Sequence, residues 1–225
     1  MSTFDLGDAT VRELNQALHQ SENQGKELLV TNPGGKHNVA TGANVNCDVT
    51  IEGHVGYYCA GMNKSASIVV NGNAGPGLAE NMMSGTVRVK GNASQYCGAT
   101  AHGGLLVIEG DAAARCGISM KGVDIVVGGS IGHMSAFMAQ SGRLVVCGDA
   151  GEALGDSIYE ARIYLRGEAK SLGTDCIEKP MEEAHKTELA ELLARAGIDH
   201  PVDEFRRYGS ARQLYNFQID NLSAY

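Results

Sequence analysis

The chain has 225 residues, a formal net charge of −8 and an isoelectric point of about 5.3. An acidic chain without a basic patch does not suit nucleic acid or an anionic membrane surface, so we expect neither as a partner. Glycine is abundant, with 30 residues, and aromatic residues make up only 5% of the chain, which is typical of a β-solenoid.

The N-terminal residues predict a short arm that precedes a set of repeats. Thr10 and Glu13 have the spacing of a helix capping box, and apolar residues follow at helical intervals, so we predict that residues 1–25 form a capped helix that Gly25 ends and that covers the open end or side of the solenoid. Residues 28–31 resemble a degenerate first coil. We therefore divide the chain into a helical arm (1–27), a solenoid (28–176) and a C-terminal extension (177–225). The first five residues are not basic and precede no apolar stretch, so we expect no signal peptide and a cytoplasmic location.

The central part of the chain repeats every 19 residues. A glycine closes a short β-branched run seven times in succession, at Gly53, Gly72, Gly91, Gly110, Gly129, Gly148 and Gly167. The residues two and four places before each glycine are all aliphatic, whereas the residue between them varies. This alternation predicts a strand of about four residues with one buried face. The step is too short for a helix-containing repeat, so the strands must stack on one another to bury that face.

Columns of small residues support one architecture. The sixth and seventh residues after each repeat glycine are small or moderately apolar, and small residues recur at the third and thirteenth. The glycines at these places permit positive φ and close approach of neighbouring coils. We predict an all-β core, a right-handed parallel β-helix of about seven 19-residue coils, with helical extensions at its N- and C-terminal ends.

The regular pattern ends near Gly173, and Pro180 opens a predicted helix over residues 181–196 that Gly197 terminates. Its expected apolar contacts are Ala184, Leu189, Leu192, Leu193 and Ala196. The tail, residues 201–225, holds Phe205, Tyr208, Tyr215, Phe217 and Tyr225. An aromatic tail of this kind either wraps the solenoid or docks on another chain.

No catalytic constellation is evident, so we predict no catalytic, cofactor or metal site on this chain. The seven histidines form no H-x-x-x-H or H-E-x-x-H pair, and the six cysteines show no metal-ligand spacing. We expect the cysteines to be buried free thiols. The alternative is a disulfide between Cys97 and Cys116, which should be neighbours one coil apart.

The corners of the predicted coils carry side chains larger than the fold needs. They are candidate interface or tunnel residues: Tyr57, Tyr58, His102, Arg115, Lys121 and His133. Surface ion pairs are the ordinary role of such basic residues, and docking of an anionic partner or substrate is the alternative for Arg115 and Lys121. Methionines in the same corners either fill gaps in the core or form an adaptable docking surface. These are Met62, Met82, Met83, Met120, Met134 and Met138.

The run GHVGYYCAGM at 53–62, together with runs 72–85 and 91–104, resembles the GXGXG domain, the carboxy-terminal β-helix of the glutamate synthase large subunit. The run ARCGISMKG at 114–122 stands where that domain carries an arginine-containing turn. This likeness spans about residues 30–175.

A closer likeness covers nearly the whole chain. LNQAL at 14–18, HVGYYCAGMN at 54–63, GHMSAFM at 132–138 and RYGSAR at 207–212 resemble the stand-alone GXGXG subunit of methylamine-glutamate N-methyltransferase, also called N-methylglutamate synthase. In that family, glutamate synthase is split into a class II glutamine amidotransferase-like subunit, this β-helix subunit, and an FMN-dependent glutamate-synthase-like subunit with an iron-sulfur cluster.

The resemblance implies a non-catalytic scaffold that joins the two other subunits and helps enclose a path for ammonia or methylamine. FMN and the iron-sulfur cluster would belong to the partner subunit. A rhizobial-type paralogue acting on another amine also fits. Two further interpretations remain: the β-helix subunit of formylmethanofuran dehydrogenase, a related solenoid, and an independent β-helix carbohydrate-active enzyme. The latter needs converging carboxylates, yet the only regular acidic column, Asp111 and Asp149, is interrupted by Ser130.

Overall fold

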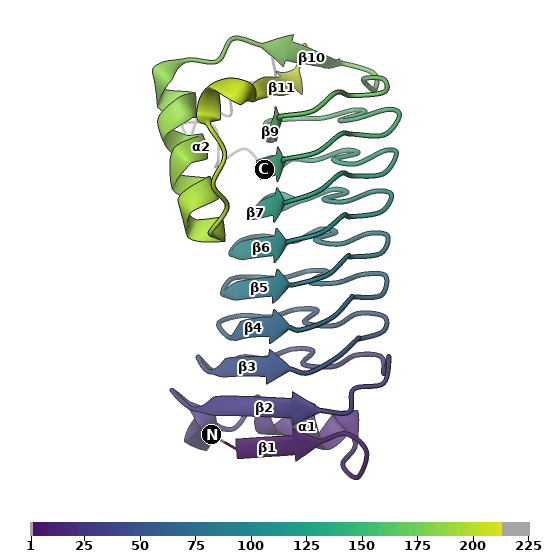
Figure 1. Ribbon diagram of the computed structural model, residues 1–225, viewed down its shortest axis with the longest axis vertical. Coiled ribbons are helices and arrows are strands. Elements are labelled where there is room, and N and C mark those ends of the chain that lie inside the picture. The colour runs from purple at the N-terminus through teal and green to yellow at the C-terminus, as the bar shows by residue number, and fades with distance from the viewer. Residues whose placement is uncertain (1, 213–225) are drawn as a thin grey trace, which may run out of the picture.

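The computed structural model describes residues 2–212 and shows one continuous stack of strands (Figure 1). Its sheet has eleven strands in the order β1-β2-β3-β4-β5-β6-β7-β8-β9-β11-β10. The strands are β1 Ser2–Asp5, β2 Glu27–Thr31, β3 Asp48–Ile51, β4 Ser67–Val70, β5 Thr86–Val89, β6 Leu105–Ile108, β7 Lys121–Val127, β8 Ser141–Val146, β9 Arg162–Leu165, β10 Cys176–Lys179 and β11 Arg206–Ser210. The helices are α1 Val11–Ala17 and α2 Glu183–Ala196, with 3₁₀ turns at Ser21–Asn23 and Val202–Glu204.

Strands β3 to β9 pair in parallel with a shift of 19 residues. Val49 lies beside Ile68, and Ile68 lies beside Val87. The register is irregular only at the start of β7, where Lys121 faces Ser141. The predicted parallel β-solenoid of about seven coils is therefore confirmed. Strand β2 adds the degenerate first coil that was predicted for residues 28–31.

Inward side chains fill the interior of the solenoid. The two aliphatic residues of each strand are buried, as Ile68 and Val70 illustrate with 0% exposure. The column six residues after each repeat glycine is also buried: Cys59, Leu78, Cys97, Cys116, Ser135 and Leu154. These side chains form one core that continues along the whole stack. Each coil depends on its neighbours, because only they cover its apolar edges.

Each coil turns through a tight corner in which alternate residues have left-handed backbone conformations. Positive φ angles recur five, seven and nine residues after the repeat glycine, for example at Tyr96, Gly98 and Thr100. The backbone amides alternate in direction, because Tyr96 N donates to Ala114 O in the next coil and Gly98 N donates to Leu78 O in the preceding one. Residues with side chains thus adopt the positive φ that the sequence pattern predicted only for glycines.

The repeat glycines allow neighbouring coils to approach closely. The Gly129 N–H donates to Gly110 O at 2.9 Å. A Cβ on Gly129 would lie 2.9 Å from the same carbonyl oxygen and would overlap Asp111 Oδ1. The column of repeat glycines is therefore required by turn geometry and by coil stacking.

Helix α2 covers the outer face of the last coils (Figure 1). Val107, Val126, Val145 and Tyr164, in the middle of strands β6 to β9, are buried against it. The equivalent residues of β3 to β5 are only partly buried. The outward-facing residues of the strands therefore differ in burial because α2 covers only part of the sheet.

Helix α2 begins two residues later than predicted. Glu182 is its N-cap and forms a capping box with His185, and Gly197 ends it with a φ of 66°, as predicted. The buried residues are Leu189, Leu192, Leu193 and Ala196. Ala184 is exposed, contrary to the prediction, because the buried face of the helix begins only at Leu189.

The C-terminal extension closes the stack with antiparallel strands. Strand β11 lies between β9 and β10 and is antiparallel to both. Phe205 and Tyr208 are buried there, so residues 201–212 wrap the solenoid. Tyr215, Phe217 and Tyr225 lie outside the described residues. The parallel pairing of the coils therefore ends at β9, and the C-terminal extension covers that edge.

The N-terminal arm contains a strand as well as a helix. Strand β1 pairs in parallel with β2, and α1 has seven residues, so a helix through residues 1–25 is wrong. The chain turns after Ala17 into a short 3₁₀ segment, which ends α1. The predicted capping box of Thr10 and Glu13 is confirmed. Leu14 and Leu18 are buried in the solenoid core, so the arm covers its end as expected. Neither described helix is long and apolar enough to cross a membrane.

Candidate functional site: the corner face of the solenoid

The six candidate interface residues fall on two lines along the stack. Tyr57, Tyr58, Arg115 and His133 lie four or five residues after a repeat glycine, and His102 and Lys121 lie eleven residues after one. The two lines flank the same corner of the coils. We call the surface formed by residues four to eleven after each repeat glycine the corner face.

Arg115 stacks on Tyr96 of the preceding coil. Its Cζ lies 5.9 Å from the centroid of the Tyr96 ring, a cation–π contact worth about 0.5–1 kcal/mol at an exposed site. The ion pairs of residues 2–212 involve other basic residues, and none involves Arg115 or Lys121. The prediction of surface ion pairs for these two residues is wrong, because the corner face offers Arg115 a tyrosine ring where a carboxylate was expected.

Tyr57 and Tyr58 form a second aromatic group on the corner face. Their ring centroids are 5.5 Å apart, and His37 lies edge-on to Tyr57 at 6.4 Å. The Tyr57 N–H donates to His37 Nδ1 at 2.8 Å, and Asn81 Nδ2 donates to the Tyr58 hydroxyl at 3.3 Å. The group is held in place by neighbouring coils, while Tyr57 remains 46% exposed.

The remaining candidates are separate polar groups. His102, Lys121 and His133 are all exposed. Within the part of the chain that the structure describes, their side chains make no hydrogen bond or ion pair. The structure therefore places the six candidates on one surface. It brings the side chains of Tyr57 and Tyr58 together, and the Arg115 N–H donates to His133 O at 2.9 Å. Tyr96 was missed by the sequence analysis, although it occupies the same position in its coil as Tyr58 and Arg115 do in theirs.

The structure divides the methionines into two groups. Met82 and Met120 are 0% exposed and fill gaps in the core, whereas Met62 and Met83 are 46% exposed and Met138 is 40% exposed on the corner face. The gap-filling interpretation is thus confirmed for Met82 and Met120, and the docking interpretation stays a prediction for the three exposed methionines. Exposed apolar side chains gathered on one face mark a surface suited to docking.

The column that follows the repeat glycines is a hydrogen-bonded ladder. Asn92 Oδ1 accepts from Asp111 N at 2.8 Å, and Asp111 Oδ1 accepts from Ser130 N at 2.7 Å. The pattern continues in both directions, from His54 to Glu168. Asp111 and Asp149 are therefore structural acceptors in successive coils, and this column does not supply the pair of catalytic carboxylates that a glycoside hydrolase requires.

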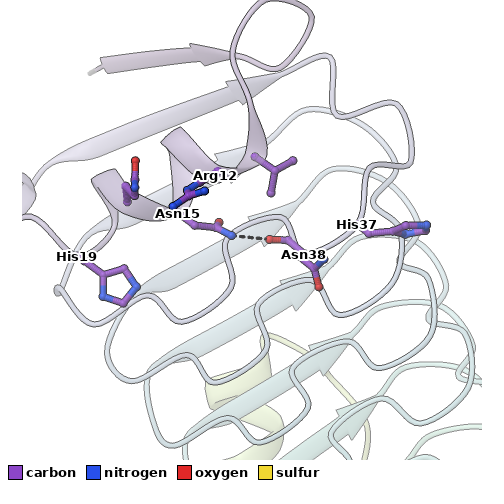
Figure 2. A pocket seen from close by; sticks show the side chains of 7 residues that line it. Arg12, Asn15, His19, His37 and Asn38 are labelled. Carbon is purple, nitrogen blue, oxygen red and sulfur yellow. Dashed lines mark hydrogen bonds between the residues drawn. The ribbon is translucent and has the colours of Figure 1, made fainter.

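A cleft of about 420 Å³ lies between α1 and the loop that carries His37 (Figure 2). Within it, Asn15 Nδ2 donates to Asn38 O at 2.8 Å, and Asn15 Oδ1 accepts from Thr41 N at 3.2 Å. Figure 2 shows His19 and His37 at opposite ends of the cleft. Its central polar groups thus hold the first coil against α1, and its two histidines do not converge on a common point.

The cysteines are confirmed as buried free thiols. Burial raises the pKa of Cys59 to about 12, and a hydrogen bond with Cys97 together with burial raises the pKa of Cys116. Thiols of this kind remain protonated and are poor nucleophiles. Across residues 2–212, no group of three or more His, Cys, Asp or Glu side chains is placed to hold a metal ion.

No protein-family model matches the chain. Among curated proteins, the chain is similar to Protein GlxC of Rhizobium meliloti (strain 1021), with 59% identity over 228 residues that cover all of both chains. Since this identity extends through the repeats, the N-terminal arm and the C-terminal extension alike, the chain belongs to the GlxC family.

Proposed function

We propose that the chain is a non-catalytic scaffold subunit of a glutamate-synthase-like enzyme complex. In this proposal it joins a class II glutamine amidotransferase-like subunit to an FMN-dependent glutamate-synthase-like subunit, which holds the flavin and an iron-sulfur cluster. The complex would act as a methylamine-glutamate N-methyltransferase and form N-methylglutamate from methylamine and glutamate. The resemblance of runs 53–62 and 132–138 to that family supports the assignment.

The observation that carries the scaffold role is the corner face. Met62, Met83 and Met138 are exposed there, as is Tyr57, on coils whose register is fixed by parallel strands and by the polar ladder. Flexible methionine side chains adapt to a partner surface, and tyrosine and arginine are the residues that most often dominate binding energy. A rigid backbone presents these side chains without a large ordering cost on association.

The packed interior limits where a path for a small amine could run. The inward columns are fully buried along the stack, from Ile68 to Leu154 and beyond. A path between the active sites of two partner subunits would therefore follow the outer surface of the solenoid. In this proposal the solenoid supplies one wall of that path and a partner subunit supplies the other.

A second candidate is a related complex that acts on another amine. The sequence also fits a rhizobial-type paralogue that acts on another amine. The similar protein comes from Rhizobium meliloti, and this source favours the second candidate. The two candidates share the scaffold role and the partner subunits and differ only in the substrate.

The test is affinity purification of the tagged chain from its native host, followed by mass spectrometry and an absorbance spectrum. We expect an amidotransferase-like chain and a flavin-containing chain to co-elute. Assays of the eluate with glutamate and either methylamine, ethylamine or ammonia would then distinguish the two candidate substrates. Elution of the chain alone and colourless would overturn the scaffold proposal.

A further inference from the structure

We infer that Tyr96 and Arg115 form the centre of a protein-docking site on the corner face, and that the docked partner presents an aspartate or glutamate side chain to Arg115. This inference rests on the proposed scaffold function and adds the chemistry that one partner surface must have.

The backbone gives the first reason. Tyr58, Tyr96 and Arg115 occupy the same place in their coils and have φ angles of 62°, 64° and 59°. Bulky residues are disfavoured in this left-handed region. At the same place, Gly77 has a φ of 70° and Ala153 a φ of 56°, so the fold accepts a small residue there. Large side chains kept at a strained position indicate a role outside the fold.

The electrostatics of Arg115 give the second reason. Its guanidinium stacks on the Tyr96 ring, and no described carboxylate forms an ion pair with it. A stacked guanidinium keeps its in-plane N–H groups available for a bidentate contact with a carboxylate. Lys121 lies in the same coil and adds a second positive charge, and the acidic residues of the corner face, among them Glu80, Glu152 and Asp156, belong to other coils. A chain of net charge −8 would repel an extended polyanion, so an acidic patch on a protein fits better than a nucleic acid.

The extent of the apolar surface gives the third reason. Exposed Met62 and Met138 lie in coils four apart, which corresponds to about 19 Å along the stack. Tyr96 and Arg115 lie in the coils between them. A charged and aromatic centre surrounded by apolar contacts that exclude water is the usual arrangement of a binding hot spot. This span fits a protein surface and exceeds what one small anion could cover.

The experiment uses the full chain and each proposed partner subunit, with affinity measured by calorimetry and stability by thermal melting. We expect Arg115→Gly and Tyr96→Gly each to weaken binding of one partner by about 30-fold. Because glycine relieves the left-handed strain, the melting temperature of Arg115→Gly should not fall. The matched control is Ala153→Gly, which makes the same backbone change at the same place in another coil, and its affinity should stay within about twofold.

The carboxylate has its own test. Arg115→Glu should abolish binding, and reversal of one acidic residue on the partner to arginine should restore it. If the parent chain binds its partners but both glycine variants bind as tightly as the parent, the docking site is wrong and the scaffold proposal stands. Failure of the parent chain to bind either partner would overturn the scaffold proposal as well. A lower melting temperature for Arg115→Gly would overturn the inference, because it would show that the fold itself needs Arg115. If the glycine variants bind the partners normally but associate less with further copies of this chain, the surface contacts a second copy, and the inference is likewise wrong.

Discussion

Asp111 Oδ1 accepts a hydrogen bond from the backbone N–H of Ser130, one coil away, at 2.7 Å. The residues 19 positions before and after Asp111, Asn92 and Ser130, take part in the same arrangement. Each coil is thus tied to the next by a side chain as well as by its strand. A fixed register holds the aliphatic faces inward, because a slip by one residue would turn them outward, and it keeps the corner side chains in line.

We predict that Asp111→Ala destabilises the solenoid modestly. The substitution removes the acceptor of the Ser130 N–H, which costs about 1 kcal/mol and lowers the melting temperature by about 2–4 °C. Asp111→Asn is the matched control, since Asn73 and Asn92 serve as acceptors in the ladder. Thermal melting followed by circular dichroism measures both variants. Equal melting temperatures for Asp111→Ala and the parent would show that water replaces the side chain.

We predict that Gly129→Ala is much more damaging. Its Cβ would overlap Asp111 Oδ1 and press on the Gly110 carbonyl, both of which belong to the tightly stacked preceding coil. Overpacking of this kind costs about 2 kcal/mol or more, or roughly 4–8 °C in melting temperature. Gly209→Ala is the control, because the nearest atom to its Cβ is Lys179 Cγ at 3.8 Å. Similar losses for the two variants would contradict the role assigned to close coil approach.

The repeating part of the fold could be predicted because its signal is local. Each strand alternates aliphatic and variable residues, and the 19-residue step places equivalent residues, such as Val49 and Ile68, side by side. The same step predicted the buried column of Cys97 and Cys116. The candidate surface followed from the same step, because Tyr58 and Arg115 are large at a place where other coils carry the small residues Gly77 and Ala153.

The remaining features depend on contacts between distant segments, which a single sequence does not reveal. Strand β1 lacks an alternating apolar pattern and is defined by its pairing with β2. Insertion of β11 between β9 and β10 likewise requires the closed end of the stack. The stacking of Arg115 on Tyr96 depends on a left-handed corner that is held by amide bonds to two neighbouring coils.

We predict that Glu188→Gln loosens helix α2 in a pH-dependent way. Burial raises the pKa of Glu188. The Tyr164 hydroxyl and the guanidinium groups of Arg162 and Arg143 together lower this pKa by more than burial raises it, so the net pKa lies below its usual range. The hydroxyl donates to Glu188 Oε1 at 2.5 Å, and Arg162 lies 2.7 Å from Oε2. Because the folded pKa is depressed, the stabilisation is fully present above the unfolded pKa of about 4.3 and is lost as pH falls through the folded pKa.

At pH 7, we therefore expect Glu188→Gln to reduce the free energy of unfolding by about 1–2 kcal/mol. The difference from the parent chain should shrink as the pH falls below about 4. The control is Glu191→Gln, which changes an exposed glutamate on the same helix. Urea unfolding from pH 7 to pH 3 measures both. If the difference in unfolding free energy between Glu188→Gln and the parent stays constant from pH 7 to pH 3, the charge of Glu188 does not contribute to stability, and its packing alone does.

We predict that the native chain resists thiol reagents. All six cysteines are free and buried, and burial raises the pKa of Cys147 and of Cys176 to about 11, so little thiolate is present at pH 8. A thiol-disulfide exchange reagent at that pH should titrate less than about one thiol per native chain and all six after unfolding without reductant. Gln95→Cys, which places a thiol at an exposed position, should add one rapidly reacting group and serves as the control. Recovery of only four thiols from the unfolded parent would instead indicate a bond between Cys97 and Cys116.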